Sequence, residues 1–285
     1  MDIKIENLGH VYMPGSPLSH TALHDINLEI KTGSFTGLIG HTGSGKSTLI
    51  QHLNGLLKQT SGRILVDGKD ISENKGDLKQ LRFNVGLVFQ YPEYQLFAET
   101  VREDIGYGPK NMGLSEAEIT ERITEAIGYV GVTEELLDKS PFELSGGQKR
   151  RVAIAGILAM RPKVLILDEP TAGLDPKGRD DMLANISRLH KEQGTTIILV
   201  SHSMEDVAKV CNRVIVMSNG TVAMHGTVSE IFSQGDVLEK MNLAVPQITR
   251  LAIRLREMGY SIPNDVFTVD RAYEVITALM KGTNK

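Results

Sequence analysis

The sequence predicts an α/β fold in which a parallel sheet carries a helical insert, followed by a small helical or α+β module. Three observations support this fold. Short apolar runs at residues 164–167, 196–200 and 213–217 alternate with helical patterns, as in a parallel α/β sheet. Between residues 92 and 140 the strand patterns give way to helical ones. From about residue 227 helical patterns predominate again.

Composition limits the function classes that fit. The chain has 285 residues, 41% of them hydrophobic, which is enough for one large domain or two smaller ones. Its formal net charge of −4 argues against a nucleic-acid partner, since such proteins usually carry a basic excess. A single cysteine, Cys211, allows no internal disulfide and fits a reducing compartment. Residues 1–6 alternate as in a strand rather than a signal peptide, and no apolar run approaches the roughly 18 residues of a membrane span.

The first elements are two strands at residues 3–8 and 26–30, joined by a stretch with many turn residues around 13–17. His20 and His24 lie four residues apart in this connection, a spacing that could suggest a metal pair. A zinc site needs further ligands, and none is nearby in the sequence. We therefore interpret both histidines as loop residues.

The phosphate-binding pattern G-x-x-x-x-G-K-[ST] begins at Gly40 and ends at Ser47. It follows an apolar strand at residues 35–39 and opens a helix at 46–57. The apolar face of this helix is predicted to contain Leu49, Ile50, Leu53 and Leu56. Backbone N–H groups at such a helix N-terminus face phosphate, and glycines let the backbone approach it. Lys46 should reach the β- and γ-phosphates and Ser47 should hold Mg²⁺. The predicted phosphate-binding residues are Gly40, His41, Thr42, Gly43, Ser44, Gly45, Lys46, Ser47 and Thr48.

The next segments are predicted strands at residues 62–66 and 85–89, separated by a polar turn at 67–68. In the insert that follows, Ser115 and Glu118 form a capping-box pattern at a helix start. Apolar residues then recur at helical spacing at Ile119, Ile123, Ala126, Ile127 and Val130.

An apolar strand at residues 164–167 ends in two acids, Asp168 and Glu169. In a nucleotide-binding fold the first acid would hold Mg²⁺ through water. The second would orient or deprotonate the water that attacks the γ-phosphate. Alone, such a pair is also consistent with a helix cap; together with the phosphate loop it indicates nucleotide hydrolysis.

A second anion site is predicted where Ser145 caps a helix running to about residue 160. The residues Ser145, Gly146, Gly147 and Gln148 follow Leu144 in the pattern Leu-Ser-Gly-Gly-Gln. The basic triplet of Lys149, Arg150 and Arg151 on this helix could contact phosphate, but we interpret it as a solvated or salt-bridged helix face.

With this pattern the sequence resembles the ATP-binding-cassette family of P-loop NTPases over roughly residues 1–230. The resemblance implies a dimer in which each signature closes over the ATP of the partner subunit. It also implies that Tyr12 stacks on adenine and that Gln90 senses Mg²⁺ and the γ-phosphate. Asp175 would be carried across the dimer, and His202 would contact the γ-phosphate. No catalytic position departs from the family pattern.

The domain boundaries follow from this resemblance. Residues 1–228 are predicted to form the nucleotide-binding domain, with a helical subdomain inserted at about 91–158. Residues 229–285 are predicted to form a C-terminal dimerisation module. A helix at 246–258 would carry an apolar stripe of Ile248, Leu251, Ala252 and Leu255. That stripe could pack on its own cassette or between the tails of two ATPases.

The segment after Gln90 is similar to that of ATPases from energy-coupling factor transporters and related cobalt or nickel importers. The predicted docking residues are Glu93, Tyr94, Leu96, Phe97 and Asp104. Exposed apolar groups mark interaction surfaces, although these aromatics could equally fill the core of the insert. Acids here would complement basic helices of a membrane partner.

The resemblance is strongest to the second ATPase subunit of the energy-coupling system. It implies a heterodimer with a similar ATPase, a shared transmembrane coupling subunit, and interchangeable substrate-binding membrane subunits. The chain would lie at the cytoplasmic face of the membrane and power uptake of vitamins or other micronutrients. A cassette ATPase of DNA repair or translation would need coiled-coil insertions or a second cassette, which the sequence lacks. A non-catalytic subunit would not need Lys46, Asp168, Glu169 and His202.

Overall fold

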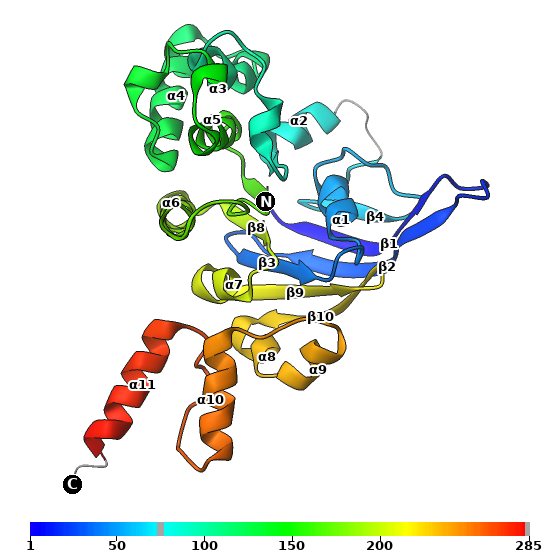
Figure 1. The fold of residues 1–285 in the computed structure, drawn as a ribbon. Coiled ribbons are helices and arrows are strands. Elements are labelled where there is room, and N and C mark those ends of the chain that lie inside the picture. Colours follow the sequence, from blue (N-terminus) through cyan, green and yellow to red (C-terminus); the bar gives the residue numbers. More distant parts are fainter. Residues whose placement is uncertain (73–76, 283–285) are drawn as a thin grey trace.

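Two sheets lie at the centre of the computed structural model, which describes residues 1–72 and 77–282 (Figure 1). The larger has six strands in the order β10-β9-β3-β8-β7-β6. Adjacent strands in this sheet are parallel, except for the antiparallel pair β9 and β10. The strands are β3 (Phe35–Gly40), β6 (Val85–Val88), β7 (Val164–Asp168), β8 (Thr196–Val200), β9 (Arg213–Ser218) and β10 (Thr221–Thr227). The predicted parallel sheet is confirmed; β10 was not predicted.

The second sheet is antiparallel, with the order β2-β1-β4-β5, and it was not predicted either. Its strands are β1 (Ile3–Tyr12), β2 (His20–Ile30), β4 (Ser61–Val66) and β5 (Lys69–Asp70). The turn at 67–68 leads into β5, so the strands predicted on either side of it belong to different sheets. His20 and His24 lie on β2, and their assignment to a loop was wrong. Register shifts in the pairing of β1 with β2 interrupt the alternation of apolar and polar residues along these strands.

Helices cover the sheets and form the insert. Before the insert the chain forms α1 (Lys46–Leu53) and α2 (Asp77–Asn84), and η1 (Pro92–Gln95) opens the insert. The insert continues with α3 (Val101–Asn111), α4 (Glu116–Val130), η2 (Glu134–Leu136), η3 (Pro141–Glu143) and α5 (Gly146–Leu158). The remainder are α6 (Pro176–Gln193), α7 (Met204–Val210), α8 (Val228–Phe232), α9 (Gly235–Lys240), α10 (Gln247–Glu257) and α11 (Val269–Gly282).

Two helix boundaries differ from the prediction. Helix α1 ends at Leu53, because Asn54 caps it and Gly55 follows with a φ of 69°. Leu56, predicted on its apolar face, is instead 45% exposed. Pro246 is the cap residue of α10 rather than part of its first turn. The predicted capping box at Ser115 and Glu118 is present.

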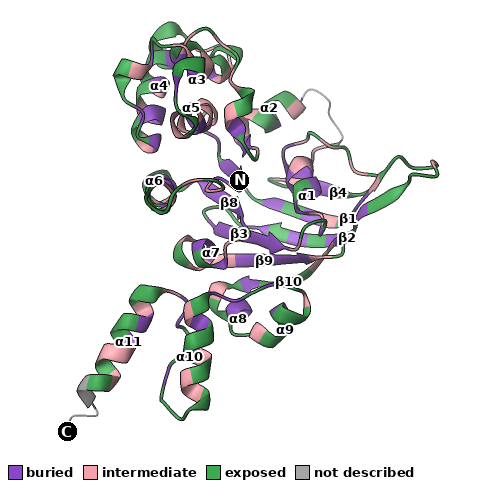
Figure 2. Ribbon diagram, viewed as in Figure 1, coloured by how far each residue is buried: buried purple, intermediate pink, exposed green. Residues whose placement is uncertain are grey.

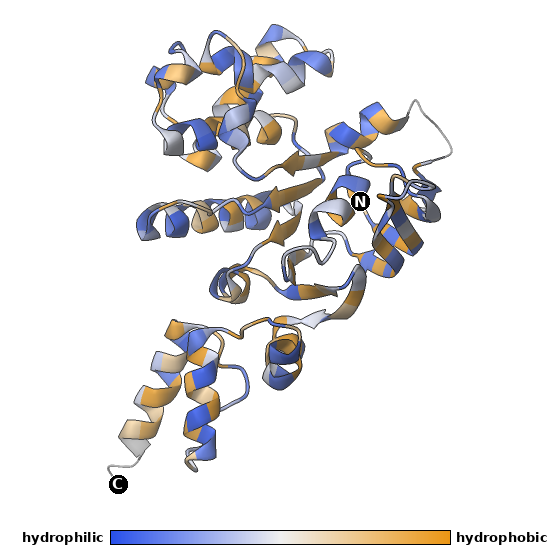
Figure 3. Ribbon diagram, turned by 45° about the vertical axis from the view of Figure 1, so that its right-hand side comes forward, coloured by the Kyte–Doolittle hydropathy of each residue, from blue (hydrophilic) through white to orange (hydrophobic). Residues whose placement is uncertain are grey.

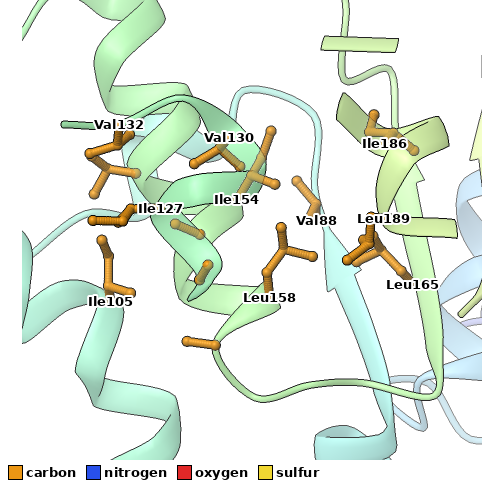
Figure 4. Packing of buried hydrophobic residues seen from close by; sticks show 14 of the residues in the cluster. Val88, Ile105, Ile127, Val130, Val132, Ile154, Leu158, Leu165, Ile186 and Leu189 are labelled. Atoms are coloured by element: carbon orange, nitrogen blue, oxygen red, sulfur yellow. The ribbon is translucent and has the colours of Figure 1, made fainter. Parts of the chain in front are cut away.

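The six-stranded sheet is buried on both faces because alternate side chains along each strand enter different cores. Leu165 and Leu167 of β7 join the core shared with α6 and the helical insert (Figure 4). Val164 and Ile166 of the same strand join the core shared with α1 and the antiparallel sheet. Figure 3 shows the resulting concentration of hydrophobic residues on the central strands. Helix α1, which opens at the phosphate loop, is thereby fixed between two sheets.

The C-terminal part is anchored at one end and free-standing at the other. Phe267 and three apolar residues between α9 and α10 pack with α7, α8 and the outer face of β9. Farther out, Ala252 of α10 packs with Ala272 and Val275 of α11 in a small separate core. Of the predicted stripe, Ala252 is buried and Ile248 and Leu255 pack against this core, whereas Leu251 is exposed. Figure 2 shows how much of α10 and α11 remains exposed.

Candidate active site

The glycine loop between β3 and α1 forms the floor of the site. Gly43 and Gly45 have φ angles of 80° and 99°, a left-handed conformation that favours glycine. At Gly45 a Cβ atom would lie 2.9 Å from the carbonyl oxygen of Ala22, so the loop also has no room for a side chain there. The Lys46 ammonium donates to the carbonyl oxygens of Gly40 and His41, at 2.6 and 3.0 Å. The loop therefore holds its lysine in place at the start of the helix.

An open cavity of about 290 Å³ lies above this floor, and residues from six parts of the chain line it, including His20 and Ala22 of β2. Strand β1 contributes Tyr12, and the segment after β6 contributes Gln90. Strand β7 ends at the site with Asp168 and Glu169, and His202 follows β8. The loop and its helix supply Thr42, Gly43, Gly45, Lys46, Ser47 and Thr48. The site gathers at the carboxyl ends of parallel strands, where α/β folds bind their ligands.

The two acids and the lysine share a buried, charged environment. Burial raises the pKa of Asp168, and the positive charge of Lys46 opposes that shift. Burial, followed by the charge of Asp168, raises the pKa of Glu169 to about 7. Burial lowers the pKa of Lys46, while Glu169 and Asp168 oppose this change. The charges are thus partly balanced within the site before any ligand is considered.

Glu169 is held in an unusual backbone conformation. Its φ is 50°, uncommon for a residue with a side chain, and such strain clusters at functional sites. Its backbone N–H donates to the carbonyl oxygen of Val200 at 3.1 Å, which ties it to β8. The Nε2 atom of His202 lies 3.7 Å from Glu169 Oε1, and burial lowers the pKa of that histidine. The two residues assigned to catalysis are therefore neighbours.

The arrangement fits ATP and Mg²⁺. The side-chain oxygens Ser44 Oγ and Glu169 Oε1 are buried without a hydrogen-bond partner, and a buried polar atom of this kind requires one. Ser47, Gln90 and Asp168 offer a hydroxyl, an amide and a carboxylate on one cavity, and Mg²⁺ prefers oxygen ligands. Among residues 1–72 and 77–282, no group of three or more His, Cys, Asp or Glu side chains could hold a metal alone. Mg²⁺ usually binds one or two carboxylates together with substrate phosphates.

The signature residues lie elsewhere, and among the described residues none of them lines this cavity. Ser145 caps α5, where its side chain accepts from the Gln148 backbone N–H and the Gln148 side chain accepts in return. A Cβ atom at Gly146 or Gly147 would meet nothing within 4 Å. Open space therefore lies beside these two glycines in the first turn of α5.

Asp175, the residue assigned to the dimer loop, has a role within this chain. Its side chain accepts from the Gly178 backbone N–H at 2.7 Å and so caps α6.

Two predicted docking acids are engaged inside the chain, which corrects the expectation that they present free charges. The Glu93 carboxylate accepts from Arg150 at 3.0 and 3.1 Å, and both side chains are largely buried. Asp104 accepts from the backbone N–H groups of Phe97 and Ala98. The aromatic residues are different: Tyr94 is 85% exposed and Phe97 is 61% exposed. Leu96 packs partly against the core of the insert.

Sequence reasoning missed several residues that support the site. Arg150 also donates to the Ala172 carbonyl, so it joins η1, α5 and the segment before Asp175. Asp206 is buried and accepts from Arg179 at 2.7 Å and from Thr171 at 3.1 Å. The basic triplet at 149–151 gave a signal for Arg150. No local pattern marked Asp206, because its partners are distant in sequence.

Residues 23–172 match the family model described as ABC transporter. The chain is 59% identical, over all of both chains, to the energy-coupling factor transporter ATP-binding protein EcfA2 of Clostridium perfringens. Relatives of the same name in Clostridium tetani and Caldanaerobacter subterraneus are 58% and 57% identical.

Solved structures of related proteins support the same family assignment. A structure of cbiO1 from Clostridium perfringens, described as part of the ABC transporter complex cbiONQ, matches with a TM-score of 0.74 at 43% identity. It covers 89% of this chain and 98% of that one. A dimeric ATP-binding cassette in a post-hydrolysis state, bound to ADP and Pi, matches with a TM-score of 0.72 at 29% identity, covering 79% and 98%. The chain belongs to the ABC transporter family, among the energy-coupling factor transporter ATP-binding proteins.

Proposed function

We propose that this chain binds and hydrolyses ATP with Mg²⁺ as an ATPase subunit of an energy-coupling factor importer for vitamins or other micronutrients. The observation that carries the proposal is the single cavity that Tyr12, Lys46, Gln90, Asp168, Glu169 and His202 share. Those residues come from separate strands and loops, and each has the chemistry that ATP hydrolysis requires. The 59% identity to a relative with an energy-coupling name supports the choice of transporter.

Each residue has a part in this proposal. The backbone of the glycine loop and Lys46 would hold the β- and γ-phosphates, and Tyr12 would stack on adenine. Ser47, Gln90 and, through water, Asp168 would hold Mg²⁺, which supplies charge neutralisation on the phosphates. Glu169 would take the proton from the attacking water, and His202 would contact the γ-phosphate. Positioning and charge stabilisation account for most of the catalysis in such transfers.

A second subunit would complete the site. The signature residues of this chain lie outside its own cavity, and open space lies beside Gly146 and Gly147 at the start of α5. A helix N-terminus of that kind suits the γ-phosphate of a nucleotide held by a partner. We therefore propose a heterodimer with a similar cassette ATPase, in which Asp175 also faces the partner.

A membrane partner would dock on the helical insert. No helix in the described ranges is long and apolar enough to cross a membrane. Tyr94 and Phe97 are exposed, and such apolar groups suit contact with helices of a transmembrane coupling subunit. That subunit, with interchangeable substrate-binding membrane subunits, would hold the chain at the cytoplasmic face of the membrane. Because Glu93 and Asp104 are engaged internally, their part in docking would be to shape this surface.

The test is co-expression of this chain with the companion ATPase and membrane subunits, followed by purification through a tag on this chain. The account expects the membrane subunits to co-purify and the complex to hydrolyse ATP only with Mg²⁺, so that chelation abolishes turnover. ATPase activity without membrane subunits in the purified material would contradict the transporter assignment. A complex that assembles but does not hydrolyse ATP would contradict the enzymatic one. The cobalt or nickel alternative is tested by which solute the assembled complex accumulates in vesicles.

A further inference from the structure

Two buried histidines behind the cavity have no part in the chemistry described so far. His10 lies on β1, two residues before Tyr12. His52 lies in α1, four residues after Thr48. Both side chains are buried, and neither lines the cavity. They occupy the space between the aromatic wall of the site and the helix that opens at the phosphate loop.

The histidines close a ring of contacts. His52 Nδ1 lies 2.7 Å from the Thr48 carbonyl oxygen, and His52 Nε2 lies 3.1 Å from His10 Nδ1. The His10 ring packs edge-on against the Tyr12 ring, with centroids 4.5 Å apart and planes at 80°. The Tyr12 hydroxyl returns to Thr48, 3.2 Å from its Oγ1. Each of the four residues therefore contacts the next, in the order Thr48, His52, His10, Tyr12 and back to Thr48.

The hydrogen bonds fix the ring orientations. A carbonyl oxygen only accepts, so His52 Nδ1 carries the proton that it donates to Thr48. A neutral His52 then has an unprotonated Nε2, which accepts from His10 Nδ1–H. That same His10 nitrogen lies 3.2 Å from the Lys58 carbonyl oxygen. Burial lowers the pKa of His52, which favours this neutral form. His10 is thus held in one plane, with its ring packed against Tyr12.

We propose that His52, acting through His10, is a positioning residue that holds the Tyr12 ring ready to stack on the adenine base. The inference rests on the proposed function, which assigns ATP to the cavity and adenine to Tyr12. Tyr12 is 38% exposed at the end of its strand, and a side chain there would otherwise sample several orientations. Holding the ring in advance reduces the entropy lost when the base binds. The effect should therefore be confined to nucleotides and absent for a ligand without a base.

The experiment measures the affinity of the full-length chain for Mg·ATP and for Mg·tripolyphosphate by calorimetry. His52→Asn keeps an amide beside the Thr48 carbonyl but does not reach His10, whereas His52→Gln reaches toward His10. Tyr12→Leu should lower ATP affinity about tenfold, the usual scale for loss of a base–aromatic stack. His52→Asn should lower it about threefold, and His52→Gln should restore most of that loss. Tripolyphosphate affinity should stay unchanged in all three variants.

The double variant and a control complete the test. Because His52 acts through Tyr12, adding His52→Asn to Tyr12→Leu should cause no further loss. His24→Asn is the matched control: His24 is exposed on β2, contacts the Asn219 carbonyl oxygen, and does not line the cavity. It should bind both ligands as the parent does.

Three outcomes would overturn the inference. Equal losses of ATP and tripolyphosphate affinity in His52→Asn would assign the histidine to the phosphate loop. Additive losses in the double variant would show that it does not act through Tyr12, and parent-like ATP affinity in His52→Asn would show no role in binding. If Tyr12→Leu itself binds ATP normally, the adenine contact of the proposed function is wrong, a failure that is distinct from the first three.

Discussion

At the scale of single residues, the site depends on where charge and strain are placed. Lys46 is buried against backbone carbonyls, and Glu169 has a left-handed backbone and an unpartnered carboxylate oxygen. Neither arrangement stabilises the fold by itself, since burying a charge or an unpaired polar atom is costly. Both are understandable if a bound phosphate pairs with the ammonium group and a water molecule beside it donates to the carboxylate oxygen.

Removing the lysine charge tests this view. Lys46→Ala should weaken Mg·ATP binding by at least about tenfold, because it removes charge compensation at the β- and γ-phosphates. Calorimetry on the purified chain measures the change, and the exposed Lys191→Ala serves as the control with parent-like affinity. Unchanged ATP affinity and turnover in Lys46→Ala would remove the loop from the site.

At the scale of elements, the buried pair of Glu93 and Arg150 joins η1 to α5. Glu93→Ala would leave the arginine charge buried and unpaired, which costs about 3 kcal/mol of unfolding free energy. Denaturant unfolding measures this. The exposed pair of Asp180 with Lys209 provides the control, and Asp180→Ala should lower the unfolding free energy much less than Glu93→Ala does. If both substitutions lowered the unfolding free energy equally, the buried pair would not be what joins η1 to α5.

The elements themselves show what local sequence can predict. The helices α4 and α5 and the strands β7 to β9 were predicted because each carries a local signal, either a capping box or a continuous apolar run. Parts of β1, β2 and β4 were predicted as strands, but their antiparallel sheet was not, because the pairing joins residues that are distant in sequence and shifts register along β1. Motif residues were found for the same local reason. The ion pairs Glu93–Arg150 and Arg179–Asp206 could not be predicted, because their partners meet only after folding.

At the scale of the whole molecule, the C-terminal part has more exposed apolar surface than a self-contained element needs. Its own core is small, and Leu251, Val269 and Tyr273 remain exposed on α10 and α11. The other members of the predicted stripe pack within that core, so the stripe itself does not decide between the two alternatives. We propose that these exposed residues contact the tail of a second ATPase and hold the pair together without nucleotide.

Substitution of the exposed residues tests this contact without disturbing either core. Leu251→Glu combined with Tyr273→Glu should weaken association of the ATPase pair without nucleotide by at least about tenfold, because charges would enter an apolar contact. Analytical ultracentrifugation measures the association. Thr120→Glu, on the exposed side of α4, is the control and should associate normally. If the double variant associates as tightly as the parent, the tail packs only on its own cassette and takes no part in the dimer.

Glu169 is the residue that we propose to activate water for ATP hydrolysis, in a cavity whose other residues bind the nucleotide. Glu169→Gln keeps the shape of the side chain but removes its ability to accept the proton. In a single-turnover assay on the assembled complex, hydrolysis at this subunit's site should slow at least about a hundredfold while ATP affinity stays within about threefold of the parent. Glu116→Gln, on the exposed start of α4, should hydrolyse at the parent rate. Parent-like single-turnover hydrolysis by Glu169→Gln, or a loss confined to ATP binding, would contradict the account.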